Sequence, residues 1–380
     1  MATFFFMQGQ NIELIVEGGK PMGGAVVATQ VWMQALHELG HTIVLFRNEE
    51  DNRKIRPEFD WIKPYKIYDS KKGVPVLRYL YYRFPKLLKA LREIKPDFVI
   101  ESIPAWTAPF HAVLCKIAGS KQVIRIANDN MLDERIKLTH STFEQIFISL
   151  GFRYCNYIMT QNTYQSQRLK MKYPGQKVIQ LINPTVLDKA FLTPKKSPKG
   201  YIAWVANFRY QKNLKLLFEI AKLLQHEEFL VAGAPMYPLD QETANYLPKL
   251  ETLPNVKFVG TIPRDGIMDF FKGAKFLLNT SRYEGFSNTF LEAMCTGTPI
   301  LSNSNVNPDG IISSYMLGYI YSDPPSLLKL LDGLDHMVYS NLSKNCVKYL
   351  NEKHDHLTLG KKLLDFLEIS SGHWVENEPM

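Results

Sequence analysis

Short hydrophobic runs alternate with helical patterns along almost the whole chain. In the first half, apolar runs predict strands, and residues 25–39 have the spacing of a helix. The predicted strands of this half are 3–8, 12–17, 42–46, 97–102, 122–127, 157–161 and 178–182. The run at 12–17 is either a second strand or the true first strand. Strands that alternate with helices are typical of βαβ units and parallel sheets.

The same alternation restarts after a stretch rich in Pro and Lys at 184–198. The predicted strands of the second half are 201–206, 229–234, 256–260, 274–280 and 299–303, with a helix at 213–224. Two such series predict an α/β protein with two doubly wound, Rossmann-like parallel sheets. Ligands bind beyond the carboxyl ends of strands in such sheets, so we expect two domains that face a common cleft, 1–183 and 184–355.

The composition fits this picture. A chain of 380 residues is too long for one ordinary core, and 46% hydrophobic with 22% charged residues is typical of a soluble globular protein. The sequence predicts neither a transmembrane helix nor a signal peptide. Four cysteines without C-x-x-C spacing indicate reduced thiols and a cytoplasmic location. The net charge of +8 suits several anionic partners, but no nucleic-acid-binding motif is present, so nucleic acid is not expected.

One short stretch matches a metal signature. Residues His37 to His41 read H-E-x-x-H, in which two histidines hold zinc and the glutamate acts as base. However, Gly40 lies where a helix ends, the next residues are strand-like, and no third ligand follows at the usual spacing. The pattern therefore favours a helix-to-strand turn with Gly40 at the helix C-terminus, and no metal is expected.

The segment 275–303 reads as a strand, an acidic loop, a short helix and a strand. Glu284 lies in the loop and Glu292 on the helix. The residues Ser287, Asn288 and Thr289 lie at the helix start, where free amides and the helix dipole favour an anion such as a diphosphate. Alternatively, Thr289 and Glu292 form a capping box, which would explain Glu292 without a ligand.

Two further loops follow predicted strands. Arg209 and Lys212 lie just before the helix at 213–224, where two cations can stabilise a diphosphate leaving group. The alternative is a pair of solvated surface charges. Gly23 and Gly24 precede the first helix and allow close approach of backbone to a ligand, although the full G-x-G-x-x-G pattern is lacking.

Taken together, these segments resemble retaining glycosyltransferases of the GT-B fold, of the family 4 type (glycosyl transferases group 1). The matching segments are 22–46, 206–213, 231–235, 255–301 and 307–312. The spacing of Glu284 and Glu292 is the most specific feature. The likeness covers about residues 20–355, and it is denser in the C-terminal half. In this fold the last helix often returns to the first domain, so we expect residues 356–380 to do so.

The resemblance implies a nucleotide-diphosphate sugar as co-substrate, with a UDP-sugar favoured, and no cofactor. It implies that Glu292 binds the ribose, that Glu284 contacts the sugar, and that Arg209 and Lys212 hold the diphosphate. Of these, Glu284, Arg209 and Lys212 are the expected catalytic residues. The other expected donor-binding residues frame the sugar, phosphates and base, namely Gly23, Gly24, Phe286, Ser287, Asn288, Thr289, Val259, Gly260 and Thr261.

The sequence departs from the family pattern at two places. Many relatives have a His-Asp pair where this chain has Asn128, Asp129 and Asn130. We expect Asn128 or Asp129 to lie on the acceptor side and face the sugar. The stretch 307–310 replaces a glycine-rich loop, and it either borders the donor or only turns the chain.

The implied reaction transfers a sugar to a hydroxyl of a saccharide or lipid-linked glycan without a metal. Its alternatives are a sugar-nucleotide epimerase or phosphorylase on the same fold, a glycoside hydrolase, and a non-catalytic sugar-nucleotide-binding protein. The segment 79–95 is basic, aromatic and roughly amphipathic. It either rests on an anionic membrane, which would place the protein at the inner face of the membrane, or forms an ordinary outer helix.

Overall fold

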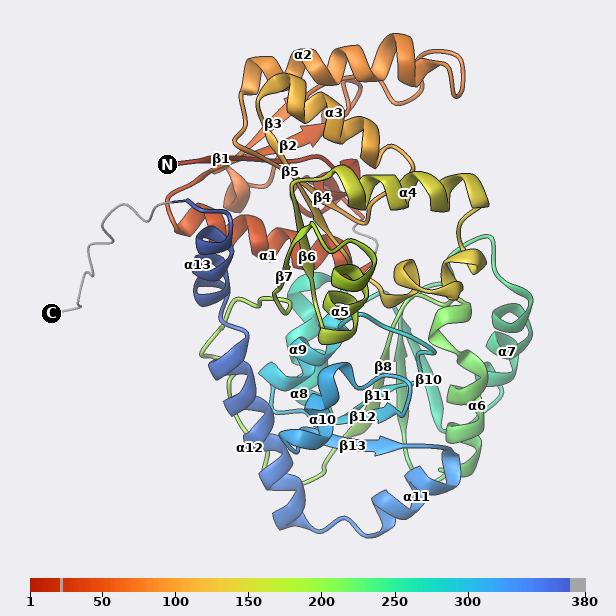
Figure 1. The fold of residues 1–380 in the computed structure, drawn as a ribbon. Helices are drawn as coiled ribbons and strands as arrows, with labels where there is room; N and C mark the ends of the chain where they lie inside the picture. Colours follow the sequence, from red (N-terminus) through yellow and green to blue (C-terminus); the bar gives the residue numbers. More distant parts are fainter. Residues whose placement is uncertain (21–22, 370–380) are drawn as a thin grey trace, which may run out of the picture. The chain divides into compact units, whose positions relative to one another are not determined.

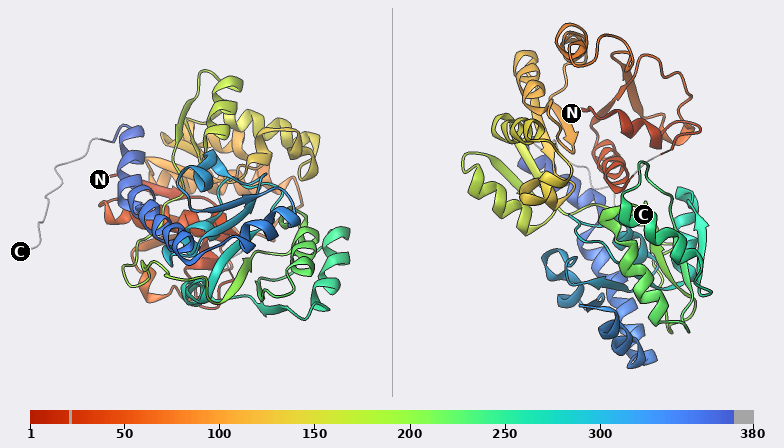
Figure 2. Two further views of the ribbon diagram at one scale, coloured as in Figure 1. Left: turned by 90° about the horizontal axis from the view of Figure 1, so that it is seen from below. Right: turned by 90° about the vertical axis from the view of Figure 1, so that its right-hand side faces the viewer.

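Two parallel sheets organise the chain, and helices cover both faces of each (Figures 1 and 2). The computed structural model describes residues 1–20 and 23–369. Unit 1 comprises residues 1–184 and the chain from His356 onward, and unit 2 comprises Thr185–Asp355. The fold class predicted from the sequence, two doubly wound Rossmann-like sheets, is confirmed.

The sheet of unit 1 has seven parallel strands in the order β3-β2-β1-β4-β5-β6-β7. The strands are β1 (Thr3–Phe6), β2 (Thr42–Arg47), β3 (Ile62–Lys66), β4 (Phe98–Ser102), β5 (Lys121–Arg125), β6 (Tyr157–Thr160) and β7 (Lys177–Gln180). The alternation of side chains along β1 divides the core. Phe4 and Phe6 pack into the cluster on one face, whereas Phe5 packs into the cluster on the other.

The helices of unit 1 lie on those two faces. They are α1 (Gly24–Glu38), α2 (Phe84–Ile94), α3 (Ala108–Ala118), α4 (Thr142–Tyr154), α5 (Thr163–Lys172) and α13 (His356–Phe366). Helices α1 and α13 pack together so closely that a Cβ on Gly360 would lie 2.7 Å from Leu39 Cδ1. The chain thus returns to unit 1 at its end, and the part of the expected crossing segment beyond residue 369 lies outside the described residues.

The strand predicted at 12–17 is wrong. Residues Gly9–Leu14 form a 3-10 helix, η1, and Val16 makes only an isolated bridge to Ile55. The side chains of Ile12, Leu14 and Ile15 are all buried. A short apolar run therefore marks burial here, but it does not distinguish a turn of helix from a strand.

The sheet of unit 2 has six parallel strands in the order β10-β9-β8-β11-β12-β13. Its strands are β8 (Tyr201–Val205), β9 (Phe229–Ala232), β10 (Val256–Gly260), β11 (Ala274–Asn279), β12 (Ile300–Asn303) and β13 (Gly318–Tyr321). Its helices are α6 (Leu214–Leu223), α7 (Gln241–Glu251), α8 (Ile267–Gly273), α9 (Asn288–Cys295), α10 (Ile311–Ser314), α11 (Pro324–Asp332) and α12 (His336–Lys353). Trp204 packs with α6 and α11 on one face, and Ala203 with α8 and α9 on the other.

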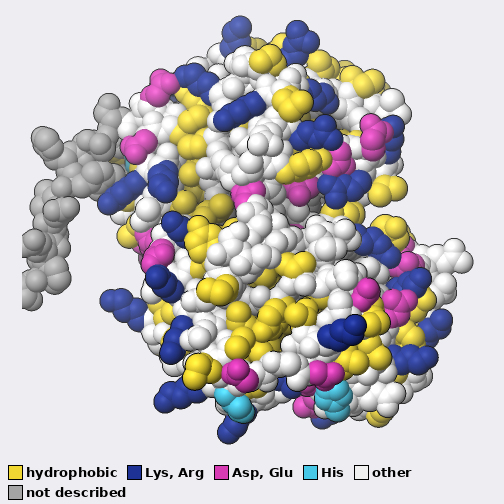
Figure 3. All heavy atoms as spheres, turned by 60° about the horizontal axis from the view of Figure 1, so that its bottom comes forward, with side chains coloured by type: hydrophobic (Ala, Val, Ile, Leu, Met, Phe, Trp, Pro, Cys, Tyr) yellow, Lys and Arg dark blue, Asp and Glu magenta, His cyan; other side chains and the backbone are white. Residues whose placement is uncertain are grey.

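The basic segment 79–95 consists of a π-helical turn, η3 (Tyr79–Arg83), followed by α2. The apolar side chains Leu87, Ala90 and Leu91 of α2 are buried against the sheet, and Phe84 is buried against Phe110 of α3. Among the described residues, no helix is long and apolar enough to cross a membrane. On the face shown in Figure 3, Lys and Arg side chains are spread among acidic and apolar ones and do not gather in one patch.

Candidate functional site

The site in unit 2 is built on the loops that follow β8 and β11. These two strands are neighbours at the centre of the sheet, and the order of strands runs in opposite directions on either side of them. Their carboxyl ends therefore form the topological switch point, where ligands bind in open parallel sheets. Two hydrogen bonds join the loops, from Thr280 Oγ1 to Lys212 O at 2.7 Å and from the Arg282 amide to Gln211 O at 2.8 Å.

All three predicted catalytic residues, Arg209, Lys212 and Glu284, lie in these loops. Lys212 Nζ forms an ion pair with Glu284 Oε1, and the two side chains are only 15% and 8% exposed. Gln211 Nε2 donates to Tyr283 O at 2.8 Å and lies 3.4 Å from Glu284 Oε2. In contrast, Arg209 Nε is buried and has no hydrogen-bond partner among the described residues. The site thus holds one compensated carboxylate and one cation whose buried donor is unused.

Helix α9 begins beside this pair. Ser287 is its N-cap residue but makes no side-chain cap hydrogen bond, and its hydroxyl lies 2.8 Å from that of Thr289. The capping box considered for Thr289 and Glu292 is not formed, because Thr289 lies inside the helix rather than at the N-cap. The Phe286 side chain is buried against Phe290 and His354, so it supports the loop from the core.

Glu292 pairs with a side chain outside its own helix. Its Oε1 pairs with Nη1 of Arg264, in the loop after β10, and the Glu292 side chain is 11% exposed. The residues expected to border the base, Val259, Gly260 and Thr261, lie at the end of β10 and in the loop after it, and all are exposed. Glu292 and the β10 loop are thereby joined through Arg264.

The stretch 307–310 turns the chain. Asn307 Oδ1 accepts from the Ile312 amide at 3.1 Å, and Gly310 takes the left-handed conformation with φ 69°. The Asn307 side chain is therefore used to begin α10.

In unit 1, Gly23 and Gly24 lie in the connection after β1, which with β4 forms the switch point of this sheet. Gly23 is the N-cap residue of α1 with φ 87°, a conformation that favours glycine, and a Cβ there would meet no atom of the described residues within 4 Å. Both glycines are exposed. Pro21 and Met22, in the same loop, lie outside the described residues.

The structure distinguishes the two acceptor-side candidates. Asp129 Oδ1 accepts from Asn162 Nδ2 at 3.0 Å and Gln165 Nε2 at 2.8 Å. Burial raises the pKa of Asp129. Asn128 is half-buried, and its side chain makes no hydrogen bond to the described residues. Asp129 therefore holds the start of α5, and Asn128 is the side chain with unused donors and acceptors.

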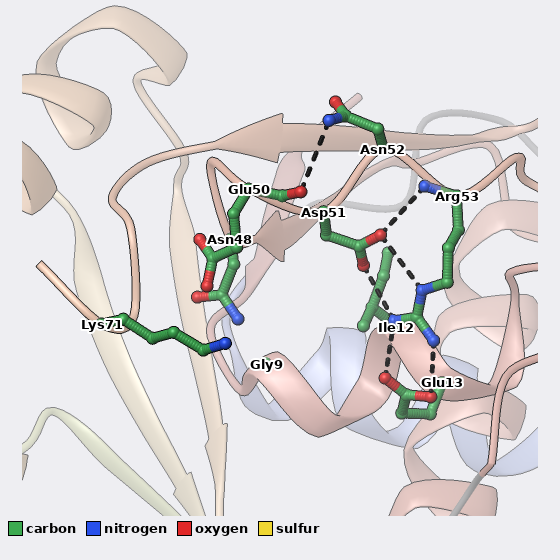
Figure 4. A pocket seen from close by; sticks show the side chains of 9 residues that line it. All are labelled: Gly9, Ile12, Glu13, Asn48, Glu50, Asp51, Asn52, Arg53 and Lys71. Carbon is green, nitrogen blue, oxygen red and sulfur yellow. Dashed lines mark hydrogen bonds and ion pairs between the residues drawn. The ribbon is translucent and has the colours of Figure 1, made fainter.

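Unit 1 also contains a polar cavity of about 610 Å³ beside the ends of β1 and β2 (Figure 4). It is lined by Gly9, Ile12, Glu13, Asn48, Glu50, Asp51, Asn52, Arg53 and Lys71. Arg53 binds both Glu13 oxygens, at 2.6 and 2.9 Å, and also Asp51. These bonds lower the pKa of both carboxyls. Figure 4 shows Lys71 extending into the cavity.

The two histidines of the H-E-x-x-H stretch have different surroundings. The His37 ring stacks on Trp61 at 4.5 Å, whereas His41 Nδ1 accepts from the Ala2 amide at 3.1 Å. Gly40 follows the C-cap of α1 with φ 83°. The stretch is the corner between α1 and β2.

Two side chains of the unit 2 site were not predicted. Gln211 and Arg264 contact the two predicted glutamates, yet neither was proposed from the sequence. Both lie in loops that follow parallel strands, so the rule that singled out Arg209 and Lys212 could also have found them.

These observations define the class of protein by its fold. Two doubly wound parallel sheets in one chain are the arrangement of the GT-B fold. Sucrose-phosphate synthase of Thermosynechococcus elongatus superposes with a TM-score of 0.78 over 97% of this chain and 98% of that one, at 12% identity. The Anabaena protein HepE in complex with UDP-glucose superposes with a TM-score of 0.73 over 97% and 100%, at 13% identity.

Part of the sequence matches a family model. Residues 188–352, which lie in unit 2, match the family described as "Glycosyl transferases group 1". Alpha-monoglucosyldiacylglycerol synthase of Streptococcus pneumoniae is 29% identical over 123 residues, which are 31% of this chain and 27% of that protein. The chain aligns with less than a third of the length of the curated relatives it matches.

Proposed function

We propose that the protein is a retaining glycosyltransferase. It moves a sugar from a nucleotide-diphosphate donor, with UDP favoured, to a hydroxyl of a saccharide or lipid-linked acceptor. The observation that carries the proposal is the group at the unit 2 switch point. There, Arg209 Nε is buried without a hydrogen-bond partner in residues 1–20 and 23–369, beside the Lys212–Glu284 pair and the start of α9. A cation, a counter-charged pair and a helix N-terminus together favour a diphosphate.

The chemistry follows from the charges. In the proposed reaction the acceptor oxygen attacks the anomeric carbon, the bond from that carbon to the diphosphate oxygen breaks, and the acceptor proton passes to a leaving phosphate oxygen on the same face. Negative charge grows on the departing diphosphate, where Arg209 and Lys212 stabilise it. Glu284 accepts hydrogen bonds from sugar hydroxyls, and Glu292 from the ribose. Because side-chain cations meet the diphosphate, we propose a reaction without a metal.

The comparisons support parts of this proposal. The HepE structure contains UDP-glucose, which favours a UDP-sugar as the donor to test first. The Streptococcus relative is named a synthase of a glucosyldiacylglycerol, which keeps a lipid acceptor among the candidates. For the acceptor we propose the polar cavity of unit 1, where Asn48, Glu50 and Lys71 offer the hydrogen-bonding groups that sugar hydroxyls need.

Thermal shift with UDP, GDP and ADP tests the donor. We expect UDP to raise the melting temperature most, with no change on adding EDTA, since a ligand that binds only the folded state stabilises it. Glu292→Ala should abolish the shift. A shift that survives intact in this variant would contradict the donor assignment.

Incubation with UDP-glucose and candidate acceptors tests the reaction, with the anomeric configuration of the product read by NMR. Transfer with retention supports the proposal. Hydrolysis alone, isomerisation of the donor, or binding without turnover would each overturn it in favour of a different class.

A further inference from the structure

Helix α3 carries apolar side chains on the side that faces solvent. Val113 and Ile117 are each more than half exposed, and Trp106 and Phe110 precede them at helical spacing. A surface helix of a globular protein normally places polar residues on this face. The opposite side of α3 packs into the core, where Cys115 is fully buried.

Helix α4 repeats the pattern. Phe143, Ile146 and Tyr154 are each more than half exposed along one side of this helix. The two helices pack against each other, and ring contacts join their exposed sides. The Phe110 ring stacks on Phe147 with centroids 5.6 Å apart, and Trp106 lies 6.1 Å from Phe143. The two stripes therefore form one continuous surface.

A third segment extends this surface. In the stretch before α2, Val76, Leu77 and Leu80 are all more than half exposed. The Tyr79 ring meets Trp106 with centroids 4.6 Å apart, which places the stretch beside the start of α3. We call the exposed apolar side chains of 74–81, α3 and α4 the apolar face. Contiguous apolar surface of this kind marks an interaction site.

Charge identifies the kind of partner. Residues 71–95, which contribute to the apolar face and continue through α2, hold eight Lys and Arg residues and one acidic residue, Glu93. The whole chain has a net charge of +8, so this segment accounts for most of it. Lys89 and Arg92 are exposed on α2. A second copy of the chain fits poorly, because a two-fold interface would bring two such segments together. Apolar side chains bordered by cations match the interface of an anionic bilayer.

We propose that the apolar face docks on the surface of an anionic lipid bilayer, with the cations of 71–95 at the level of the head groups. This differs from an amphipathic α2 lying on a membrane, since the apolar side of α2 is buried in the core. The inference does not depend on the proposed sugar transfer, because bilayer binding is measured without nucleotide or acceptor.

The test is co-sedimentation of the full chain with vesicles. We expect binding at low salt to vesicles of phosphatidylcholine with phosphatidylglycerol, and little binding to phosphatidylcholine alone. The double variant Phe143→Ser, Ile146→Ser should bind about tenfold or more weakly. Lys89→Gln should weaken binding about fivefold, the effect of about one cation at a charged surface. The control is Met337→Ser in unit 2, which removes an apolar side chain that is even more exposed than Phe143 and Ile146 and should leave binding unchanged.

The altered side chains are more than half exposed, so the variants should melt within a few degrees of wild type, and melting is measured alongside. The proposal would be overturned if the wild-type protein did not co-sediment with the anionic vesicles at low salt. Vesicle binding that Phe143→Ser, Ile146→Ser leaves intact would also overturn it. Dimers in solution that this variant dissociates, without any vesicle binding, would instead indicate a second copy of the chain as the partner. UDP binding, read separately, reports on the donor site whatever the vesicles show.

Discussion

The Lys212–Glu284 ion pair is the feature of the donor site that a stability measurement tests most directly. Replacing Lys212 by Met leaves the Glu284 carboxylate 8% exposed, with Gln211 Nε2 3.4 Å away as a weak partner. Removing one partner of a buried pair costs about 3–5 kcal/mol, because the other charge stays buried without compensation. Both side chains keep some contact with solvent, so we expect the lower end, about 3 kcal/mol. For a unit of this size that lowers the melting temperature by about 6–12 °C.

The assay is a double-mutant cycle followed by thermal and urea unfolding of the full chain. The variant Lys212→Met, Glu284→Gln buries no charge, so it should unfold within about 1 kcal/mol of wild type. The exposed pair of Lys257 and Glu228, with side chains 66% and 46% exposed, is the matched control. Lys257→Met should cost less than about 1 kcal/mol.

The double variant also separates stability from binding. It should be folded and yet bind UDP weakly, because it lacks the cation that we assign to the diphosphate. A Lys212→Met variant that melts within about 2 °C of wild type, together with no coupling in the cycle, would refute the reasoning. It would mean that Lys212 and Glu284 are not paired in the free protein.

Three further changes have defined outcomes. Arg209→Ala should weaken UDP binding by about 10- to 100-fold in calorimetry. It should change unfolding little, since Arg209 Nε has no hydrogen-bond partner to lose among the described residues. Unchanged affinity would remove Arg209 from the proposed donor site. Burial raises the pKa of Asp129, so the folded protein favours the protonated carboxyl and wild-type stability should fall as pH rises through the ordinary Asp range near 4. Asp129→Asn should lose that dependence in urea unfolding, and an unchanged pH profile would contradict the assignment. Gly318→Ala would place a Cβ 1.8 Å from Ile300 O and should cost at least about 2 kcal/mol, whereas Gly175→Ala, with nothing within 4 Å, should be nearly neutral in the same melts.

The alternation of apolar runs and helical patterns was enough to predict the two sheets, because strands buried on both faces have almost uninterrupted apolar sequences. The prediction failed where a strand is not buried on both faces. β3 (Ile62–Lys66) is an edge strand with exposed lysines, so it has no apolar run to detect. The run at 12–17 is buried but short, and burial alone does not determine backbone conformation.

The predicted site residues came from one topological rule together with a resemblance. The rule looks for charged and polar residues in loops after parallel strands, and it brought Arg209 and Lys212 to the same edge of the sheet as Glu284. It cannot give the pairing of side chains, because that depends on rotamers and on distances between loops far apart in sequence. The structure pairs Lys212 with Glu284 and Arg264 with Glu292, where the sequence suggested that Lys212, Glu284 and Glu292 each contact a ligand.

This pairing has a physical cause that bears on binding. A carboxylate that is 8% or 11% exposed, as in Glu284 and Glu292, is costly to bury without a counter-charge, so an empty site needs cations at those places. A nucleotide-diphosphate sugar brings phosphates that can take the Lys212 cation and hydroxyls that can donate to both carboxylates. On binding, Lys212 and the two carboxylates would then exchange their partners in the protein for groups of the ligand, and no charge would be left uncompensated. Arg209 has no such partner to exchange, because its buried Nε makes no hydrogen bond within the part of the chain that the structure describes. We therefore expect Arg209 to contribute more net affinity for the diphosphate than Lys212, even though Lys212 contributes more to stability.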